Sequence, residues 1–132
     1  YIRDNLQTLI KRELGKEVKF NFCLCGYYET NGKGIPHHSD TVPTQKDLVA
    51  SVSFGSPRVF EWRTYEKYIK RTSNTSVINT AMLNITRTKQ YILEDGDVLI
   101  FDGKSQMNST HAILDTVPPI GDRINLTFRT GI

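Results

Sequence analysis

The chain has 132 residues, of which 17 are lysine or arginine and 14 are aspartate or glutamate, and its formal net charge is +3. This length suits one domain with a sizeable core and is too short for two ordinary ones, so we expect residues 1–132 to form a single domain. So small a positive charge is compatible with a polyanionic partner but does not identify one. Because no stretch approaches the roughly 20 apolar residues of a membrane span, we expect no membrane partner.

The chain begins at Tyr1 rather than Met, which is consistent with a piece of a longer protein, and its first residues show no signal-peptide pattern. Cys23 and Cys25 are separated by one residue, so on a strand their side chains would point to the same face. A disulfide is not expected, and reduced thiols fit an intracellular protein. The compartment and the oligomeric state stay open.

Hydrophobic spacing predicts one helix followed by short strands. Apolar side chains recur at helical spacing over residues 2–14, and Gly15 suits a helix end. Beyond it, β-rich runs separated by turn residues predict strands at 18–28, 48–54, 58–62, 90–93, 98–101, 112–114 and 124–128. This order of elements favours a mainly β fold, an antiparallel sandwich or jelly roll with an N-terminal helix.

Two polar segments interrupt the predicted strands. Residues 64–88 are rich in Lys, Arg, Thr, Ser and Asn, and we interpret them as a long hairpin excursion or loop inserted between two strands. Their basic side chains could follow a phosphate backbone, although a solvated loop is the more common explanation. The turn Asp95-Gly96-Asp97 offers two carboxylates, but Asp and Gly are ordinary turn residues and we interpret the turn as structural.

The most informative motif is His38-Ser39-Asp40. Residues two apart on a strand project to the same face, so His38 and Asp40 could both reach one metal ion while Ser39 faces away. His111 precedes an apolar run that would place it on a strand. Two imidazoles and one carboxylate are the ligand set of a facial Fe(II) site with open positions. Surface polar residues give the same triplet by chance, and His111 alone is equally well a core or surface histidine.

His37 and three aromatic residues are candidates for contact with a substrate. In a regular strand His37 would lie on the opposite face from His38, so it is a neighbour of the metal site rather than a ligand. Phe60, Trp62 and Tyr65 could stack a nucleic-acid base. The apolar run at Phe60 favours a core position for it, and Trp62 on the same face joins it.

The segment 123–129 alternates strictly, with Arg123, Asn125, Thr127 and Arg129 on one face and apolar residues on the other. The alternation predicts a half-buried strand, and a solvated polar face is its plain explanation. Two features favour a binding role instead. A hairpin connection to the His111 segment would bring the polar face near the metal, and a jelly-roll mouth is a setting in which Arg pairs strongly with carboxylates.

Taken together, these residues resemble the AlkB-type 2-oxoglutarate- and Fe(II)-dependent dioxygenases over residues 20–129. The matching segments are 24–28, 35–40, 52–60 and 93–99, followed by His111 and the pattern Arg-x-Asn-x-x-x-Arg at 123–129. The resemblance implies a double-stranded β-helix, which is a form of jelly roll. It also implies that His38, Asp40 and His111 bind Fe(II).

The same resemblance implies how the co-substrate is held. Arg123 and Arg129 would bind the two carboxylates of 2-oxoglutarate, with Arg123 favoured for the distal one, and Tyr28 and Asn125 would donate further hydrogen bonds. One departure is Gly26, which stands where the family usually carries an Asn that contacts the co-substrate.

The activity implied is the oxidation of a substrate C–H bond with O2, while 2-oxoglutarate is converted to succinate and CO2. The family's usual target is an N-methyl group on a base of DNA or RNA, which must be unpaired or flipped out. Thr41 and Val42 stand where acidic residues commonly follow the metal-binding motif, so base selectivity stays open. Two alternatives also remain: the same chemistry on a protein or lipid, and a non-catalytic module that recognises modified nucleic acid.

Overall fold

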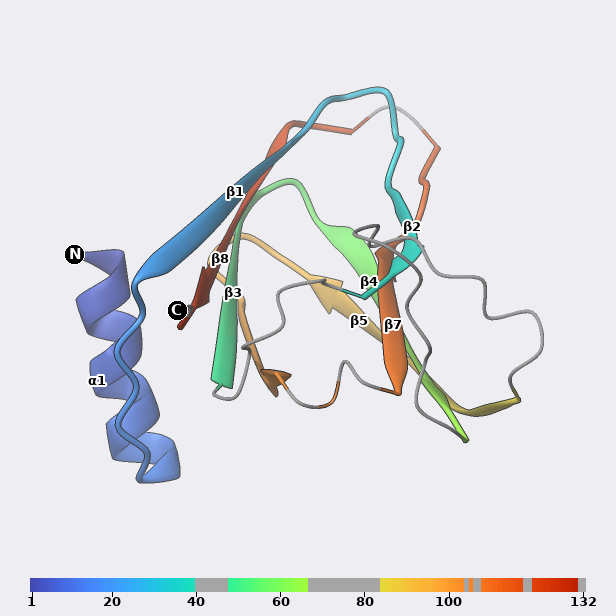
Figure 1. Cartoon of the computed structure of the whole chain (residues 1–132). Coiled ribbons are helices and arrows are strands. Elements are labelled where there is room, and N and C mark those ends of the chain that lie inside the picture. Colours follow the sequence, from blue (N-terminus) through green and yellow to red (C-terminus); the bar gives the residue numbers. More distant parts are fainter. Residues whose placement is uncertain (40–47, 67–83, 104, 106–107, 118–119, 131–132) are drawn as a thin grey trace.

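The computed structural model describes residues 1–39, 48–66, 84–103, 105, 108–117 and 120–130. Within these ranges, helix α1 (Ile2–Leu14) is followed by strands that form two four-stranded antiparallel sheets (Figure 1). The first sheet has the order β1-β8-β3-β6 and contains β1 (Phe22–Tyr28), β3 (Leu48–Gly55), β6 (Val98–Asp102) and β8 (Arg123–Arg129). The second has the order β2-β7-β4-β5 and contains β2 (Ile35–His38), β4 (Arg58–Tyr65), β5 (Ile85–Leu93) and β7 (Ser109–Ile113).

The chain passes back and forth between these two sheets. Among the described strands, β4 and β5 are the one consecutive pair that shares a sheet, and every other connection changes sheet. Alternation of this kind between two antiparallel sheets is the arrangement of a jelly roll. The predicted fold class, a mainly β jelly roll with an N-terminal helix, is therefore confirmed.

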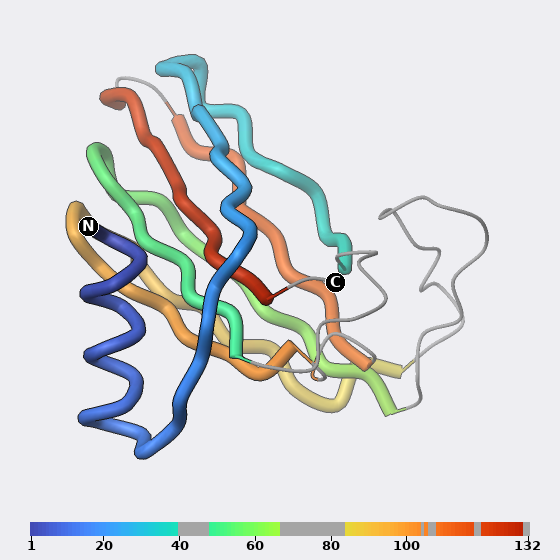
Figure 2. The backbone as a smooth tube through the Cα atoms, turned by 60° about the vertical axis from the view of Figure 1, so that its left-hand side comes forward, coloured from blue at the N-terminus to red at the C-terminus, as the bar shows by residue number. Residues whose placement is uncertain are grey.

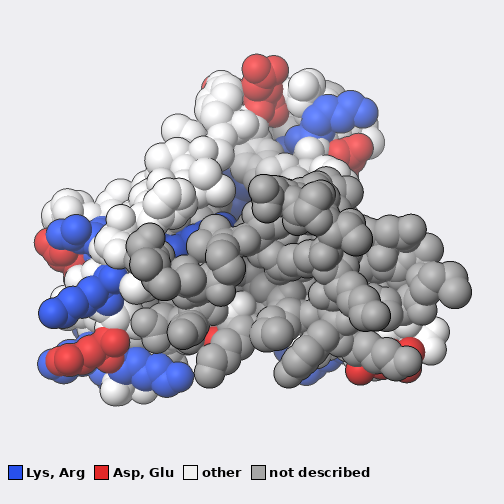
Figure 3. Space-filling model, in the orientation of Figure 1, with Lys and Arg blue, Asp and Glu red and all other residues white. Residues whose placement is uncertain are grey.

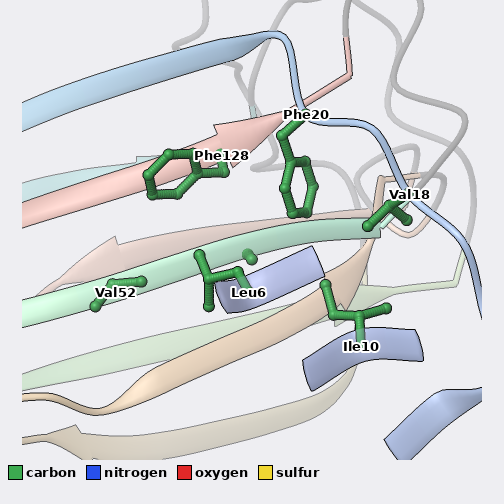
Figure 4. Close-up of a cluster of buried hydrophobic side chains, with 7 residues drawn as sticks. Leu6, Ile10, Val18, Phe20, Val52 and Phe128 are labelled. Atoms are coloured by element: carbon green, nitrogen blue, oxygen red, sulfur yellow. The ribbon is translucent and has the colours of Figure 1, made fainter. Parts of the chain in front are cut away.

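Helix α1 has the bounds that the hydrophobic spacing predicts, and it lies along the outer side of the first sheet (Figures 1 and 2). The helix ends at Gly15, whose backbone N–H donates to the carbonyl of Lys11 at a positive φ of 66° that suits glycine. The buried side of the helix packs into a cluster with the sheet (Figure 4), formed by Leu6, Ile10, Val18, Phe20, Ala50, Val52 and Phe128.

The exposed side of α1 carries charges of both signs, seen at the lower left of Figure 3. Lys11 Nζ lies 2.8 Å from the Glu17 carboxylate, and this contact raises the pKa of Lys11 and lowers that of Glu17. Both side chains are solvated, so the pair contributes little to stability. The helix is thus held to the protein by its apolar side.

The first strand begins later than predicted. β1 starts at Phe22, whereas the apolar pattern predicts a strand from residue 18. Val18 and Phe20 are buried against α1, and the backbone N–H of Phe20 donates to Gln7 Oε1 at 2.8 Å rather than to a neighbouring strand. These apolar residues are therefore explained by contact with the helix.

Residues 64–88 were predicted to form a long hairpin excursion or a loop, and both ends of this segment form the paired strands of a hairpin. β4 continues to Tyr65 and β5 begins at Ile85, and the two pair in register with Thr64 opposite Arg87. β5 is exposed along its length except at Leu93, so it lacks the alternation of apolar residues by which a half-buried strand is predicted. Residues 67–83 lie outside the described part of the chain.

The turn at 95–97 is structural, as predicted. The backbone N–H of Gly55 donates to Asp95 Oδ1 at 2.8 Å, and that of Glu94 donates to Asp97 Oδ2 at 2.8 Å. Gly96 has a positive φ of 85°, which the turn requires. Both carboxylates therefore fix loop backbone and are not directed to a metal.

Two further observations concern the cysteines and the helices. Cys23 and Cys25 are free, exposed thiols on β1. In the ranges that the structure describes, no helix is long and apolar enough to cross a membrane.

We expect Ile10→Ala to lower the free energy of unfolding by about 2–5 kcal/mol, because Ile10 is fully buried between α1 and the first sheet. Urea denaturation measures the loss. Leu14→Ala, on the same helix but 51% exposed, is the matched control and should change stability by less than about 0.5 kcal/mol. Equal losses in the two variants would contradict this packing of the helix.

Candidate metal and co-substrate site

A cavity of about 300 Å³ lies between the two sheets. Its walls come from β1, β3, β6 and β8 of the first sheet and from β2, β4 and β7 of the second. Figure 3 shows basic side chains between the surface over β1 and the atoms that are not described. The site residues predicted from the sequence meet in this cavity wherever the structure describes them: Tyr28, His38, His111, Arg123, Asn125 and Arg129.

The two predicted histidine ligands face each other across neighbouring strands. His38 on β2 pairs with His111 on β7, and their ring centroids are 4.4 Å apart. His38 Nδ1 lies 2.9 Å from the carbonyl of Pro36, which can only accept, so this nitrogen carries the proton. In the neutral ring Nε2 then has its lone pair available, which is the tautomer that a metal ligand requires.

The ring of His111 is held by aromatic side chains. Phe60 and Trp62 on β4 stack on it at centroid distances of 5.5 and 5.7 Å, and Phe101 on β6 lies at 6.1 Å. Phe60 also belongs to a buried cluster with Leu93 and Ile113, so its predicted core position is confirmed, and Trp62 packs against that cluster. This packing restricts the His111 ring to a narrow range of orientations.

Asp40, the predicted carboxylate ligand, lies outside the described residues, as do Thr41 and Val42. Ser39 is buried, and its hydroxyl donates to the carbonyl of Ser109 at the start of β7. Among the described residues no cluster of three metal-binding side chains is found, in keeping with the position of Asp40 outside them.

Arg123 is a buried cation with unused donors. Its side chain is 2% exposed, and Nη2 donates to Ser53 Oγ at 2.8 Å. Nε and Nη1 are buried and have no hydrogen-bond partner among the described residues, and no described carboxylate pairs with the guanidinium. Burial lowers the pKa of Arg123, although an arginine stays charged in a protein. A carboxylate entering the cavity would satisfy both the charge and the free N–H groups.

Tyr28 is flanked by two guanidinium groups, and Arg58, which carries one of them, was not predicted as a site residue. The Arg123 guanidinium lies 4.7 Å from the centroid of the Tyr28 ring, and that of Arg58 lies 5.7 Å from it. Arg58 is buried and donates to the backbone carbonyls of Gly32 and Leu114. Burial raises the pKa of Tyr28, and the two arginines oppose that rise. Side chains alternate along β4, so Arg58 lies on the same face as Phe60, which lines the cavity. This alternation could have identified Arg58 as a site residue from the sequence.

Asn125 and Arg129 line the cavity from β8. The amide of Asn125 already donates to Ser51 Oγ at 2.7 Å and to the carbonyl of Val52 at 3.1 Å. A bond from Asn125 to a co-substrate would therefore replace one of these contacts. Arg129 is 6% exposed and follows Arg123 on the same face of the strand.

His37 points away from the cavity, as the alternation predicts for a neighbour of the metal site. Its Nε2 lies 2.7 Å from Glu61 Oε1 and its Nδ1 lies 2.9 Å from Thr110 Oγ1. Burial lowers the pKa of His37, and the hydrogen bond with Glu61 opposes this. Hydrogen bonds from Gln90 and His37 lower the pKa of Glu61. Both ring nitrogens are thus engaged, and His37 is not placed to contact a substrate in the cavity.

A second cavity of about 230 Å³, here called the aromatic hollow, adjoins the first. Phe60 and Phe101 line both, and Trp62 and Tyr91 complete its aromatic walls. Arg87 and Lys89 on β5 lie at the same hollow, and Lys89 Nζ is 5.9 Å from the centroid of the Tyr91 ring. Tyr65 is not part of it.

Tyr65 was a candidate for stacking a base, and the structure places it elsewhere. Its side chain is 3% exposed, and its hydroxyl lies 3.3 Å from Thr110 Oγ1. A base cannot reach a ring buried in this way.

The structure is thus a jelly roll in which paired histidines and buried arginines line one cavity. The chain matches the model of the 2OG-Fe(II) oxygenase superfamily over residues 1–129, and it therefore belongs to this superfamily. The cofactor and co-substrates that membership implies are Fe(II), 2-oxoglutarate and O2.

The chain is also similar to curated proteins named alpha-ketoglutarate-dependent dioxygenase alkB homolog 3. It is 31% identical to the human protein over 128 residues, which cover 95% of this chain and 42% of that protein. It is 32% identical to the Bos taurus protein over 113 residues, which cover 84% of this chain and 36% of that protein. These similarities confirm the AlkB-type resemblance, and the chain spans less than half the length of these relatives.

Proposed function

We propose that this chain is a 2-oxoglutarate-dependent dioxygenase domain in which His38, Asp40 and His111 bind Fe(II). The observation that carries the proposal is the presence of the His38–His111 pair and the buried Arg123 guanidinium in one cavity. The tautomer of His38 suits a metal, and the Nε and Nη1 nitrogens of Arg123, which have no hydrogen-bond partner among the described residues, suit a carboxylate.

Within this site, Arg123 binds the distal carboxylate of 2-oxoglutarate and Arg129 binds the other. Tyr28 donates its hydroxyl proton to the co-substrate, and its raised pKa keeps that proton on the phenol. Asn125 is a further donor, at the expense of one of its contacts within the first sheet. The aromatic residues around His111 exclude water from that side of the cavity.

The substrate that we propose is an N-alkylated base of DNA or RNA. Bound Fe(II) supplies the activation of O2 that converts 2-oxoglutarate to succinate and CO2 and hydroxylates a substrate C–H bond. One oxygen atom enters succinate and the other enters the product. Hydroxylation of an N-methyl group gives a carbinolamine, which releases formaldehyde and leaves the demethylated base.

The aromatic hollow supports a nucleic-acid substrate. Trp62 and Tyr91 offer ring faces on which a base can stack, and Arg87 and Lys89 are exposed cations that can contact phosphate. Phe60 and Phe101, whose rings pack on His111, line both the hollow and the cavity of the proposed metal site. A strand whose reacting base lies at the metal could therefore place a neighbouring nucleotide in the hollow.

Replacing Arg123 tests the co-substrate site. We expect Arg123→Met to weaken 2-oxoglutarate binding by at least about 30-fold, since loss of one partner of a buried charge pair costs about 2–5 kcal/mol. The protein without ligand should be equally stable or more stable, because a buried unpaired cation has been removed. Thermal unfolding at increasing 2-oxoglutarate concentration, with Mn(II) in place of Fe(II), measures both effects.

The matched control for this experiment is Arg87→Met, which removes an exposed arginine outside the co-substrate cavity. Its stabilisation by 2-oxoglutarate should equal that of the unmodified chain. The same ligand-dependent stabilisation in Arg123→Met would exclude Arg123 from the co-substrate site.

Binding of a methylated single-stranded oligonucleotide should change the fluorescence of Trp62, the only tryptophan in the sequence. A base stacked in the aromatic hollow would contact this ring directly. Arg87→Met and Lys89→Met should each weaken binding and reduce the slope of log affinity against log salt by about 1, which is the effect of losing one phosphate contact. Lys33→Met, an exposed lysine elsewhere, is the control and should change neither quantity.

Product analysis separates this function from its alternatives. Succinate and formaldehyde should form together when methylated DNA or RNA is supplied with Fe(II), 2-oxoglutarate and O2. Turnover of methylated peptides or lipids alone would favour the alternative substrates. Oligonucleotide binding without any succinate would favour a non-catalytic module.

A further inference from the structure

β2 is held to the second sheet by few backbone contacts. It is a four-residue strand at the edge of the sheet, and β7 is its one neighbour among the described strands. The backbone pairs at Ile35 with Ile113 and at His38 with His111, and the register shifts between these two positions. A short edge strand with an irregular ladder is easily displaced. His38, one of the three proposed iron ligands, lies on this strand, so its position depends on how firmly β2 is held.

The side chain of His37 ties β2 to two other strands. Its Nδ1 lies 2.9 Å from Thr110 Oγ1 on β7, and its Nε2 lies 2.7 Å from Glu61 Oε1 on β4. One arrangement of protons gives both ring nitrogens of His37 a hydrogen bond to these partners. The Thr110 hydroxyl donates to Nδ1, and Nε2–H donates to the Glu61 carboxylate.

Glu61 is itself fixed by neighbouring side chains. Gln90 on β5 donates to Glu61 Oε2 at 2.6 Å, and Arg63 Nη2 lies 3.0 Å from Oε1. The side chains of His37 and Glu61 are only 16% and 8% exposed. Hydrogen bonds to a charged and shielded carboxylate are stronger than neutral ones, so this network resists displacement more than an exposed pair would.

The network lies on the face of the second sheet opposite the cavity. His37 immediately precedes His38, and Thr110 immediately precedes His111. Side chains alternate along a strand, so a bond between His37 and Thr110 on one face fixes how the two imidazoles meet on the other.

We propose that His37, Thr110 and Glu61 form a brace that sets the position of β2 and thereby holds His38 opposite His111 for metal binding. The three are positioning residues, since none of them lines the cavity. The proposal rests on the proposed function in assigning the iron ligands. The side chains of the brace, on the face of the sheet opposite the cavity, thereby set the geometry of the metal site.

The test uses the whole chain and two measurements that need no turnover. Co(II) affinity, from isothermal titration calorimetry, reports the metal site. Amide hydrogen exchange reports how firmly β2 is held. His37→Phe should raise the Co(II) dissociation constant about 10-fold, the lower end of the effect of removing supporting groups around metal ligands. The β2 amides should exchange faster, while those of α1 and β8 keep their protection.

Thr110 provides a matched pair of variants that keep the fold intact. Thr110→Val preserves shape but removes the hydroxyl, so it should weaken Co(II) binding and speed exchange in β2. Thr110→Ser keeps the hydroxyl and should restore both values toward those of the unmodified chain. Because Thr110 itself has no role as a ligand, this pair also separates the brace from direct coordination by His37.

Ile10→Ala controls for a general loss of stability, because it weakens the core on the other sheet. The brace is overturned if His37→Phe and Thr110→Val change Co(II) affinity and β2 exchange no more than Ile10→Ala does. If the unmodified chain binds no Co(II), the assigned metal site fails instead. The brace is then tested by amide hydrogen exchange alone. Faster exchange of the β2 amides in His37→Phe and Thr110→Val supports the brace, and unchanged exchange rejects it.

Discussion

Side chains along an extended strand point alternately to the two faces of its sheet, and the site in this protein depends on that geometry throughout. On β8, the alternation sends Arg123, Asn125 and Arg129 to the cavity. It sends Phe128 on the same strand to the cluster that holds α1. One strand therefore contributes both to the core and to the site, and a shift of one residue in its register would exchange the two sets. The pairing of β8 between β1 and β3 fixes this register on both sides.

A buried cation without a carboxylate partner is costly to a folded protein. Arg123 and Arg58 are each 2% exposed, and both carry N–H groups without a described partner. A group of this kind left unsatisfied costs about 1–3 kcal/mol or more when charged. The ring of Tyr28 between them provides partial compensation through its π face. Such an arrangement is expected where a ligand supplies the missing negative charge, and a carboxylate bound there would make the protein more stable than its free form.

Much of the fold and of the candidate site could be predicted from the sequence, because the patterns that indicate them are local. The spacing of apolar residues such as Leu6 and Ile10 predicts the helix. The alternation of polar and apolar residues from Arg123 onward predicts the polar face that lines the cavity. The extent of β5 could not be predicted, because a strand exposed on both faces has no hydrophobic period. The hydrogen bond between His37 and Thr110 could not be predicted either, because the two residues are 73 positions apart in the sequence and no local pattern connects them. Contacts of this kind depend on which strands the fold brings together.

The three parts of the proposed site lie on different strands, and this has a consequence for specificity. The proposed metal ligands come from β2, the segment after it and β7, and the proposed co-substrate residues come from β1 and β8. The cations at the aromatic hollow come from β5, whose one buried residue is Leu93. A substitution at Arg87 or Lys89 therefore disturbs neither the core nor the oxidising residues. We expect that changes on β5 can alter the choice of substrate at little cost in stability, whereas changes on β2 or β8 affect the chemistry for every substrate.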